Sequence, residues 1–212
     1  MEDVPEPIDA SLLAVLERSR ELGFLGPGPV MAHVLHARSY LHLLDETRPL
    51  RVLDLGSGGG VPGLVLAHER LDLEVTLLDG MEKRCTFLER AVDDLGLGER
   101  VEVVCGRAEE VAHRAERRRR YDAVVARSFA SPAVTAECAA GFLRSGGHLI
   151  VSEPPGDPAV TRWSADALEQ LGLAPLQRWT DGTAHLQVLI QHTECPPRYP
   201  RRVGVPAKRP LF

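Results

Sequence analysis

No stretch of this sequence is apolar for long enough to cross a membrane. The chain has 212 residues, of which 44% are hydrophobic and 26% charged, and its apolar runs fall short of the roughly 18 residues that a membrane-spanning helix needs. Its first residues, MEDVPEPIDA, are acidic where a secretory leader would be basic and then apolar. The composition is that of one globular domain with terminal extensions, and we expect a cytoplasmic protein without a membrane partner.

Cysteine patterns that bind zinc or cross-link small secreted domains are also missing. The four cysteines are far apart and form no CxxC pair: Cys85, Cys105, Cys138 and Cys195. We therefore expect buried or free thiols, and neither a zinc site nor a disulfide framework. His33 and His36 share a predicted helix but have no third ligand, so we expect no metal and interpret them as helix-face or pocket-lining side chains.

The chain also lacks an excess of positive charge. The formal net charge is -5, so the chain has no overall attraction to phosphate and any nucleic-acid binding needs a local basic patch. Three segments are candidates: Arg117–Arg120, Lys83–Arg84 and a tail at 194–212. The tail is predicted to be extended and irregular, and it carries five cations: Arg198, Arg201, Arg202, Lys208 and Arg209.

Apolar runs alternate with amphipathic segments through the middle of the chain. The apolar runs are at 51–55, 74–79, 101–106, 121–126 and 147–152, and the predicted helices are at 62–70, 81–96, 107–115 and 132–143. This alternation is typical of a doubly wound α/β fold with a mostly parallel sheet covered on both faces. Helical periodicity at 8–22 and 30–45 predicts a helical lid ahead of this core.

Near the C-terminus the pattern changes to a hairpin. After a predicted helix at 159–171, two extended runs flank Asp181-Gly182, a dipeptide that favours a tight turn. A parallel sheet that ends in an antiparallel hairpin is the Rossmann-like order of class I methyltransferases, and differs from the second half of a dehydrogenase. We divide the chain into an N-terminal helical extension (1–48), a core (49–193) and the basic tail (194–212).

The segment VLDLGSGGGVPG at 52–63 predicts a cofactor loop. An apolar strand leads directly into glycines that let the backbone turn sharply and let a ligand touch the main chain. The loop also matches GxGxxG, a weak sign of dinucleotide binding. Asp54 favours S-adenosylmethionine instead, because a carboxylate there can hold the methionine ammonium but would repel a pyrophosphate; a loop cap is the structural alternative.

Asp79 ends the next strand, about 20 residues after the glycines. An acid at this position can accept hydrogen bonds from both ribose hydroxyls, in either cofactor class. A solvated strand-end acid or a helix cap is the structural alternative. From the loop and the strand ends, we expect the cofactor to contact Asp54, Gly56, Ser57, Gly58, Gly60 and Asp79.

Four pieces of the sequence resemble the RsmG (GidB) methyltransferases, which methylate N7 of a guanine in bacterial 16S ribosomal RNA. They are LDLGSGGGVPGL at 53–64, LLDGMEKRCTFL at 77–88, GRAEEVA at 106–112 and VVARSFAS at 124–131. The resemblance implies S-adenosylmethionine as cofactor and ribosomal RNA or the small ribosomal subunit as partner.

The resemblance also assigns roles to individual positions. It implies that Gly56 and Val61 line the methionine and adenosine side, that Asp79 holds the ribose, and that Ala108 and Glu109 border the adenine. Met81 is placed to cover an adenine face, or else to pack as a core residue at a helix start. Arg127 is expected at the mouth shared by cofactor and substrate, as the catalytic residue; an ion pair with a surface acid is its alternative.

Three departures from the family pattern keep other functions open. The Asn-Leu-Thr stretch before the loop is absent and His36 stands where the family has an acid, while Ser152-Glu153-Pro154-Pro155-Gly156 replaces a Leu-Lys-Gly stretch. Losing that lysine and gaining an acid favours a small-molecule acceptor as the alternative substrate. A third possibility, a binding protein that has lost catalysis, is disfavoured because Asp54, the glycines and Asp79 are all present.

Overall fold

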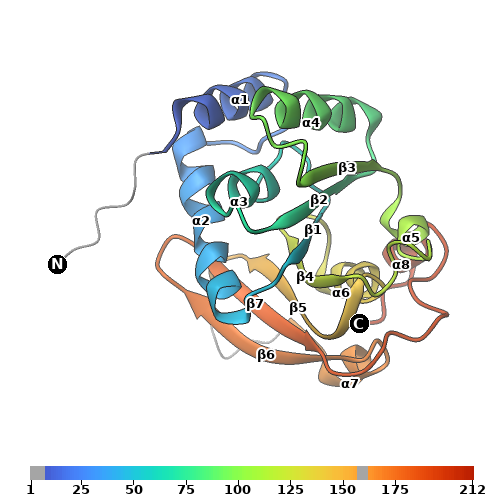
Figure 1. Ribbon diagram of the computed structural model, residues 1–212. Helices are drawn as coiled ribbons and strands as arrows, with labels where there is room; N and C mark the ends of the chain where they lie inside the picture. Colours follow the sequence, from blue (N-terminus) through green and yellow to red (C-terminus); the bar gives the residue numbers. More distant parts are fainter. Residues whose placement is uncertain (1–7, 157–161) are drawn as a thin grey trace.

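The computed structural model describes residues 8–156 and 162–212, and it contains a seven-stranded sheet of order β3-β2-β1-β4-β5-β7-β6 (Figure 1). The first five strands are parallel, and β7 and β6 add the antiparallel hairpin. This confirms the predicted fold class. The strand bounds are β1 Arg51–Leu55, β2 Glu74–Asp79, β3 Val101–Cys105, β4 Tyr121–Ala126, β5 Leu143–Glu153, β6 Leu173–Thr180 and β7 His185–Gln191.

Eight helices surround the sheet in the described part of the chain. They are α1 Ala10–Glu21, α2 Val30–Thr47, α3 Gly63–Glu69, α4 Glu82–Asp94, α5 Ala108–Val111, α6 Pro132–Ala140, α7 Ala165–Glu169 and α8 Val205–Lys208. None of them is long and apolar enough to span a membrane. The domain boundaries drawn from the sequence remain a prediction.

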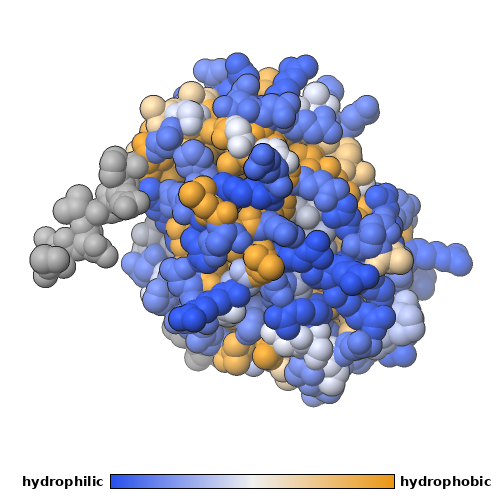
Figure 2. All heavy atoms as spheres, viewed as in Figure 1, coloured by the Kyte–Doolittle hydropathy of each residue, from blue (hydrophilic) through white to orange (hydrophobic). Residues whose placement is uncertain are grey.

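Alternating strand residues form two apolar cores, one on each face of the sheet. Val52, Leu77 and Val125 pack with α1–α4, whereas their neighbours Leu53, Leu78 and Val124 pack with α5–α7. Successive strand side chains point to opposite faces, so apolar residues at both parities are buried only if helices cover both sides. On the outer face drawn in Figure 2, hydrophilic side chains dominate and apolar ones show through in small groups.

The N-terminal helices pack onto the core. Tyr40 of α2 is fully buried and its hydroxyl donates to the carbonyl oxygen of Ala126 at 2.9 Å. Ser19 of α1 is also buried, and it donates to the carbonyl oxygen of Gly59 at 2.9 Å. The predicted helical lid therefore contacts both the glycine loop and the end of β4.

Several predicted elements differ in extent. Helix α5 ends at Val111, and the chain after it forms only turns. The helix predicted at 107–115 was therefore too long. The helix predicted at 159–171 is found over Ala165–Glu169, and its first three positions lie outside the described residues. The Asp181-Gly182 turn is not a two-residue turn, because the Asp181 carboxylate accepts N–H bonds from Thr183 and Ala184 and widens it to four residues.

The expectation of four free thiols is wrong for one pair. Cys85 of α4 and Cys105 of β3 form a disulfide, while Cys138 and Cys195 are free and buried. The two paired residues are 20 positions apart, and only the packing of α4 across the sheet brings them together. The spacing of the cysteines along the sequence gives no sign of such a contact.

Candidate functional site

The order of the strands reverses between β1 and β4, and at such a point the carboxyl ends of parallel strands leave a crevice for a ligand. The glycine loop leaves β1 there and turns back against β2, because the N–H groups of Gly56 and Ser57 both donate to the carbonyl oxygen of Leu78, at 2.8 and 2.9 Å. The loop is thus fixed beside the end of β2, where Asp79 lies.

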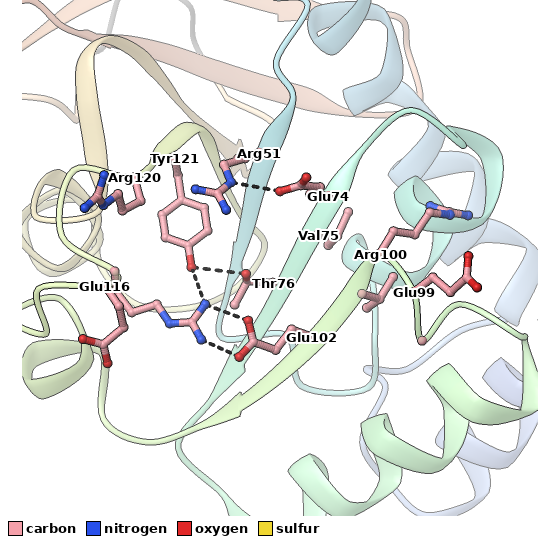
Figure 3. Close-up of a pocket in the computed structure, with 13 residues that line it drawn as sticks. Arg51, Glu74, Val75, Thr76, Glu99, Arg100, Glu102, Glu116, Arg120 and Tyr121 are labelled. Atoms are coloured by element: carbon pink, nitrogen blue, oxygen red, sulfur yellow. Dashed lines mark hydrogen bonds and ion pairs between the residues drawn. The ribbon is translucent and has the colours of Figure 1, made fainter.

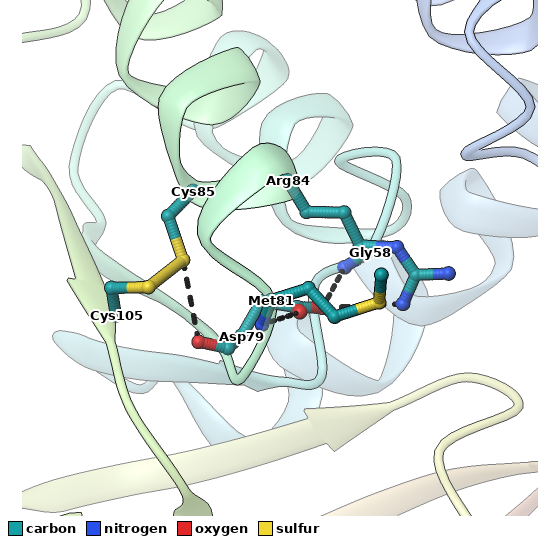
Figure 4. The surroundings of a disulfide bond; sticks show 6 residues. All are labelled: Gly58, Asp79, Met81, Arg84, Cys85 and Cys105. Carbon is teal, nitrogen blue, oxygen red and sulfur yellow. Dashed lines mark hydrogen bonds and ion pairs between the residues drawn. A yellow bond between two sulfur atoms is a disulfide. The ribbon is translucent and has the colours of Figure 1, made fainter.

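Asp79 organises the loop with both of its oxygens. Oδ2 accepts a hydrogen bond from the N–H of Gly58 at 2.9 Å, and Oδ1 accepts one from the N–H of Met81 at 2.8 Å. Gly58 has a φ of +53°, a backbone conformation that side chains disfavour. The carboxylate is buried, and Arg84 lies 3.7 Å away (Figure 4). Asp79 therefore fixes the glycine loop through Gly58 and the approach to α4 through Met81.

The disulfide lies directly behind Asp79. Cys85 Sγ is 3.4 Å from the Asp79 carbonyl oxygen (Figure 4), and Cys105 is the register partner of Asp79 on β3. The cross-link therefore ties α4 and β3 to the strand end that supports the loop.

Asp54 is buried at the end of β1 with one oxygen bonded and the other without a partner. Oδ2 accepts the N–H of Gly63 at 2.9 Å, while Oδ1 is buried and has no hydrogen-bond partner. A side chain at Gly63 would collide with this carboxylate, so glycine is required for the contact. Burial raises the pKa of Asp54 to about 7, against the lowering effect of the Gly63 bond.

The far side of the crevice is formed by the start of α5 and by the C-terminal tail. Glu109 is buried and accepts hydrogen bonds from the N–H of Gly204 at 3.0 Å and from Arg107 at 3.3 Å. Burial raises the pKa of Glu109, but the hydrogen bonds to its carboxylate outweigh burial and hold the pKa below its usual value. Ala108 is buried beside it.

A cavity of about 50 Å³ lies at this edge. Of the predicted residues, Gly56, Asp79, Ala108 and Glu109 line it. Ser57 is buried and donates to the carbonyl oxygen of Asp54, and Gly60 turns the loop with a φ of +94°. Val61 packs in the apolar core on the α1–α4 side, and Met81 is 49% exposed at the start of α4; neither lines the cavity.

Arg127 follows β4 and is half-buried. Its Nη2 group donates to Nδ1 of His33 at 2.6 Å, and no acid among the described residues forms an ion pair with it. The described part of the chain therefore gives no support to the alternative role for Arg127, an ion pair with a surface acid. Burial lowers the pKa of Arg127, which remains a cation.

Phe129 was missed from the sequence as a residue of the site, and His33 was expected as a helix-face or pocket-lining side chain, without its contact with Arg127 being foreseen. The Phe129 ring lies so close to Gly56 that a Cβ there would be 2.5 Å from Cδ2, and His33 contacts Arg127. Phe129 stands two positions after Arg127 in the motif VVARSFAS at 124–131, and this position could have identified it as a residue of the site. His33 is 94 residues from its partner, and no local pattern connects them.

The basic segments are less free than their sequence indicates. Arg117 pairs with Glu102 and Arg119 with Glu194, while Arg118 donates to the carbonyl oxygens of Cys195, Pro196 and Tyr199. In the tail, Arg201 forms a two-pronged ion pair with the fully buried Glu137. Arg198 and Arg202 remain exposed beside the crevice.

A second hollow lies at the opposite edge of the sheet, and several of the charges that line it are paired with one another. It has a volume of about 210 Å³. Arg51 pairs with Glu74, and Arg117 bonds both Glu102 and the Tyr121 hydroxyl (Figure 3). It lies at the amino ends of the strands, away from the glycine loop. Within the described residues, no group of three or more possible metal ligands is found.

Comparison with known proteins agrees with the motifs. The model of a family described as rRNA small subunit methyltransferase G matches residues 28–153. A protein of that name from Moorella thermoacetica is 38% identical over 84% of this chain and 77% of its own length. A second, from Rubrobacter xylanophilus, is 38% identical over 95% and 81%.

Solved structures share the fold. An O-methyltransferase from Bacillus cereus in complex with SAH has a TM-score of 0.63 at 18% identity, covering 89% of this chain and 94% of its own. A methyltransferase from Geobacter sulfurreducens has a TM-score of 0.64 at 18% identity, covering 88% and 90%.

Proposed function

This chain belongs to the rRNA small subunit methyltransferase G family, and we propose that it transfers a methyl group from S-adenosylmethionine to N7 of a guanine in 16S ribosomal RNA. The observation that carries the proposal is Asp54, whose Oδ2 is held by the glycine loop while Oδ1 is buried without a partner. A buried acceptor without a donor is costly, and an ammonium group would supply that donor.

The residues at the crevice fit S-adenosylmethionine chemically. Asp54 would receive the methionine ammonium, and Asp79, fixed by Gly58 and Met81, keeps lone pairs for the ribose hydroxyls. Ser57, Gly58 and Gly60 shape the loop around the ligand, and Gly56 would let it approach the backbone. When bound, the cofactor supplies a methyl group that its sulfonium makes electrophilic.

On the adenine side, Ala108 and Glu109 would form the wall, and Met81, directly before α4, would cover one face of the base. The Gly204 N–H bond to Glu109 lets the tail support this wall. Val61 would act only through the core packing of the loop.

The cavity is too small for the whole cofactor, since ligand pockets commonly span about 300–1,000 Å³. Phe129 lines the cavity close to Gly56, and it is the side chain that we expect to move when the cofactor binds. Binding should therefore shift the segment 127–131 that also carries Arg127.

Methyl transfer to guanine N7 needs alignment more than a strong base, because N7 already has a free lone pair. Arg127 would contact O6 or a nearby phosphate and leave N7 free. One of its five N–H donors is occupied by His33, so the others can meet the substrate. Because A-form RNA hides N7 in a deep groove, the guanine must lie in a loop or leave its stack.

RNA affinity would come from a few exposed cations. Arg198 and Arg202 lie beside the adenine wall on a tail that Arg201 anchors, and they would contact backbone phosphates without reading sequence. A ribosomal substrate places the proposed reaction in the cytoplasm.

The small-molecule alternative rested partly on Glu153 as an added acid at the substrate side. Glu153 instead accepts hydrogen bonds from Arg162 and from the indole of Trp163, each at 3.2 Å. Its charge is used within the fold, which weakens that alternative.

The proposal is tested by incubating the protein and labelled cofactor with undermodified small ribosomal subunits, with free ribosomal RNA and with a metabolite extract. We expect label in 16S RNA, at N7 of a guanine. Label only in the metabolite fraction would refute the RNA substrate and leave the methyltransferase assignment in place.

A further inference from the structure

His33 is a buried histidine whose two ring nitrogens have different partners. On one side of the ring, Nε2 lies 3.1 Å from the carbonyl oxygen of Gly26. On the other side, Nδ1 lies 2.6 Å from Nη2 of Arg127. The side chain is 6% exposed, so water has little access to replace either contact.

These partners determine the tautomer of the ring. A carbonyl oxygen only accepts hydrogen bonds, so Nε2 must carry the proton that it donates to Gly26. A guanidinium only donates, so Nδ1 must present a lone pair to Arg127. Both conditions hold only for the neutral ring protonated on Nε2.

The pair lies at the reacting end of the crevice. Arg127 directly follows β4, and Asp54 is paired in register with Val125 two residues earlier. His33 therefore connects α2 to the part of the sheet edge where the methionine end of the cofactor is proposed to bind.

A neutral partner has an electrostatic consequence. Arg201 is held by Glu137 and Arg117 by Glu102, and in these pairs the carboxylate offsets the charge of the arginine. His33 fixes the Arg127 guanidinium in place but contributes no negative charge. The full positive charge of Arg127 then remains available to an anionic or electron-rich substrate.

We propose that His33 is a positioning residue that holds Arg127 toward the RNA substrate, as the neutral Nε2–H tautomer, without neutralising it. The proposal rests on the function proposed above and adds a residue to it.

The sharpest test compares His33→Asn, His33→Asp and His33→Phe. Asn keeps a neutral acceptor close to the position of Nδ1, Asp keeps an acceptor but adds a charge, and Phe keeps a ring without an acceptor. We expect kcat for 16S RNA, at saturating cofactor, to stay within a few fold for His33→Asn. His33→Asp and His33→Phe should each lose about tenfold or more, the size of one hydrogen bond to a charged group.

The Asn and Asp variants form a nearly isosteric pair. If His33 only anchored the fold, Asp would serve at least as well as Asn, because it would form an ion pair with Arg127. Equal kcat values for the Asn and Asp variants, or an unchanged kcat for His33→Phe, would overturn the proposal. The cofactor Kd should change little in all three, and thermal unfolding identifies any variant that does not fold.

A pH profile gives a readout that a purely structural role would not move. Burial, and then the charge of Arg127, lower the pKa of His33 below 6.5, so the ring is neutral at pH 7 and is protonated only on acidification. Protonation removes the acceptor, so wild-type kcat should fall at acid pH and the His33→Asn variant should lack that decline. Other groups near the pair are His36, Tyr40, Asp54 and Asp181; saturating cofactor removes the contribution of Asp54 to binding.

Two further measurements separate this proposal from the proposed function. Nitrogen NMR of histidine-labelled protein reports the tautomer without any turnover, and a charged ring or an Nδ1–H tautomer at pH 7 would refute the inference alone. If the wild-type protein methylates nothing, the proposed function fails instead. His148→Asn is the matched control, since His148 is half-buried in β5 and pairs in register with Ala123, toward the amino end of the strands; it should leave kcat unchanged.

Discussion

Charged side chains lie at both edges of the sheet, and the two edges differ in how buried those charges are and in what satisfies them. At the amino edge, the largely exposed Arg51 of β1 pairs with Glu74 of β2, and Arg117, from the turn before β4, pairs with Glu102 of β3 (Figure 3). At the carboxyl edge, Asp54 keeps a buried oxygen without a partner, and Arg127 is held by a neutral ring. A hollow lined by charges is therefore a weak guide to function, whereas a buried carboxylate oxygen without a donor at a strand end calls for an explanation.

The largest difference between the edges should appear on substitution of Arg127. We expect Arg127→Ala to lower kcat and kcat/KM together, by about 100-fold, the usual effect of losing one donor that acts in the transition state. Cofactor affinity measured by calorimetry should be nearly unchanged. If only the cofactor Kd rises, Arg127 binds the cofactor and does not act on the substrate.

Asp79→Ala should weaken cofactor binding and have little effect on the rate of methyl transfer at saturating cofactor. The loss of charge-assisted hydrogen bonds to the ribose corresponds to about 1.5–3 kcal/mol, or about 10- to 150-fold in Kd. Glu102→Ala, at the amino edge, is the matched control and should leave Kd unchanged. Because Asp79 also holds the loop, Asp79→Asn separates the two roles: it retains one acceptor and should recover part of the affinity. Unaltered affinity in Asp79→Ala would mean that the ribose is held elsewhere.

The protonation of Asp54 should make cofactor binding depend on pH. Burial raises the pKa of this carboxyl to about 7, and only the ionised form attracts an ammonium group. Affinity should therefore fall as the pH drops from 8 through 7, to about a tenth of its alkaline value at pH 6. Calorimetry at several pH values would show this slope, and Asp54→Asn should bind weakly with no such slope. A pH-independent Kd in the wild-type protein would contradict an ammonium contact at Asp54.

The tail offers a smaller effect on RNA binding. Each phosphate contact on single-stranded RNA contributes about -0.7 to the slope of log affinity against log salt. Arg198→Ala with Arg202→Ala should therefore flatten that slope by about 1.4, without changing cofactor affinity. Deleting residues 198–212 is a poorer experiment, because Tyr199 and Pro206 are buried and Arg201 pairs with Glu137. An unchanged slope in the double variant would assign these cations to solvent.

The smallest effect is expected for a surface pair at the amino edge. Arg51 and Glu74 are each more than half exposed, so Glu74→Gln should change the free energy of unfolding by about 1 kcal/mol or less. Chemical denaturation measures this directly. A larger loss, or any loss of methyl transfer, would remove the contrast between the two edges.

The sequence by itself determined the architecture and the cofactor loop. Strand positions could be predicted from apolar runs of the right length, because strands that are buried on both faces are apolar along their whole length and do not alternate with polar residues. Asp54 and Asp79 were identified because they stand at fixed distances from glycines along one continuous segment. Such features can be recognised from the spacing of residues within one segment, and they do not depend on contacts between distant parts of the chain.

Only the tertiary structure decided which side chains are paired with a distant residue and which charged groups have no partner. The pairing of Cys85 with Cys105, of Arg201 with Glu137 and of His33 with Arg127 joins residues 20, 64 and 94 positions apart. Such contacts are set by the packing of helices on the sheet, which no local spacing records. For the same reason Arg118 looked like part of a basic patch in the sequence, although it holds the tail in the fold.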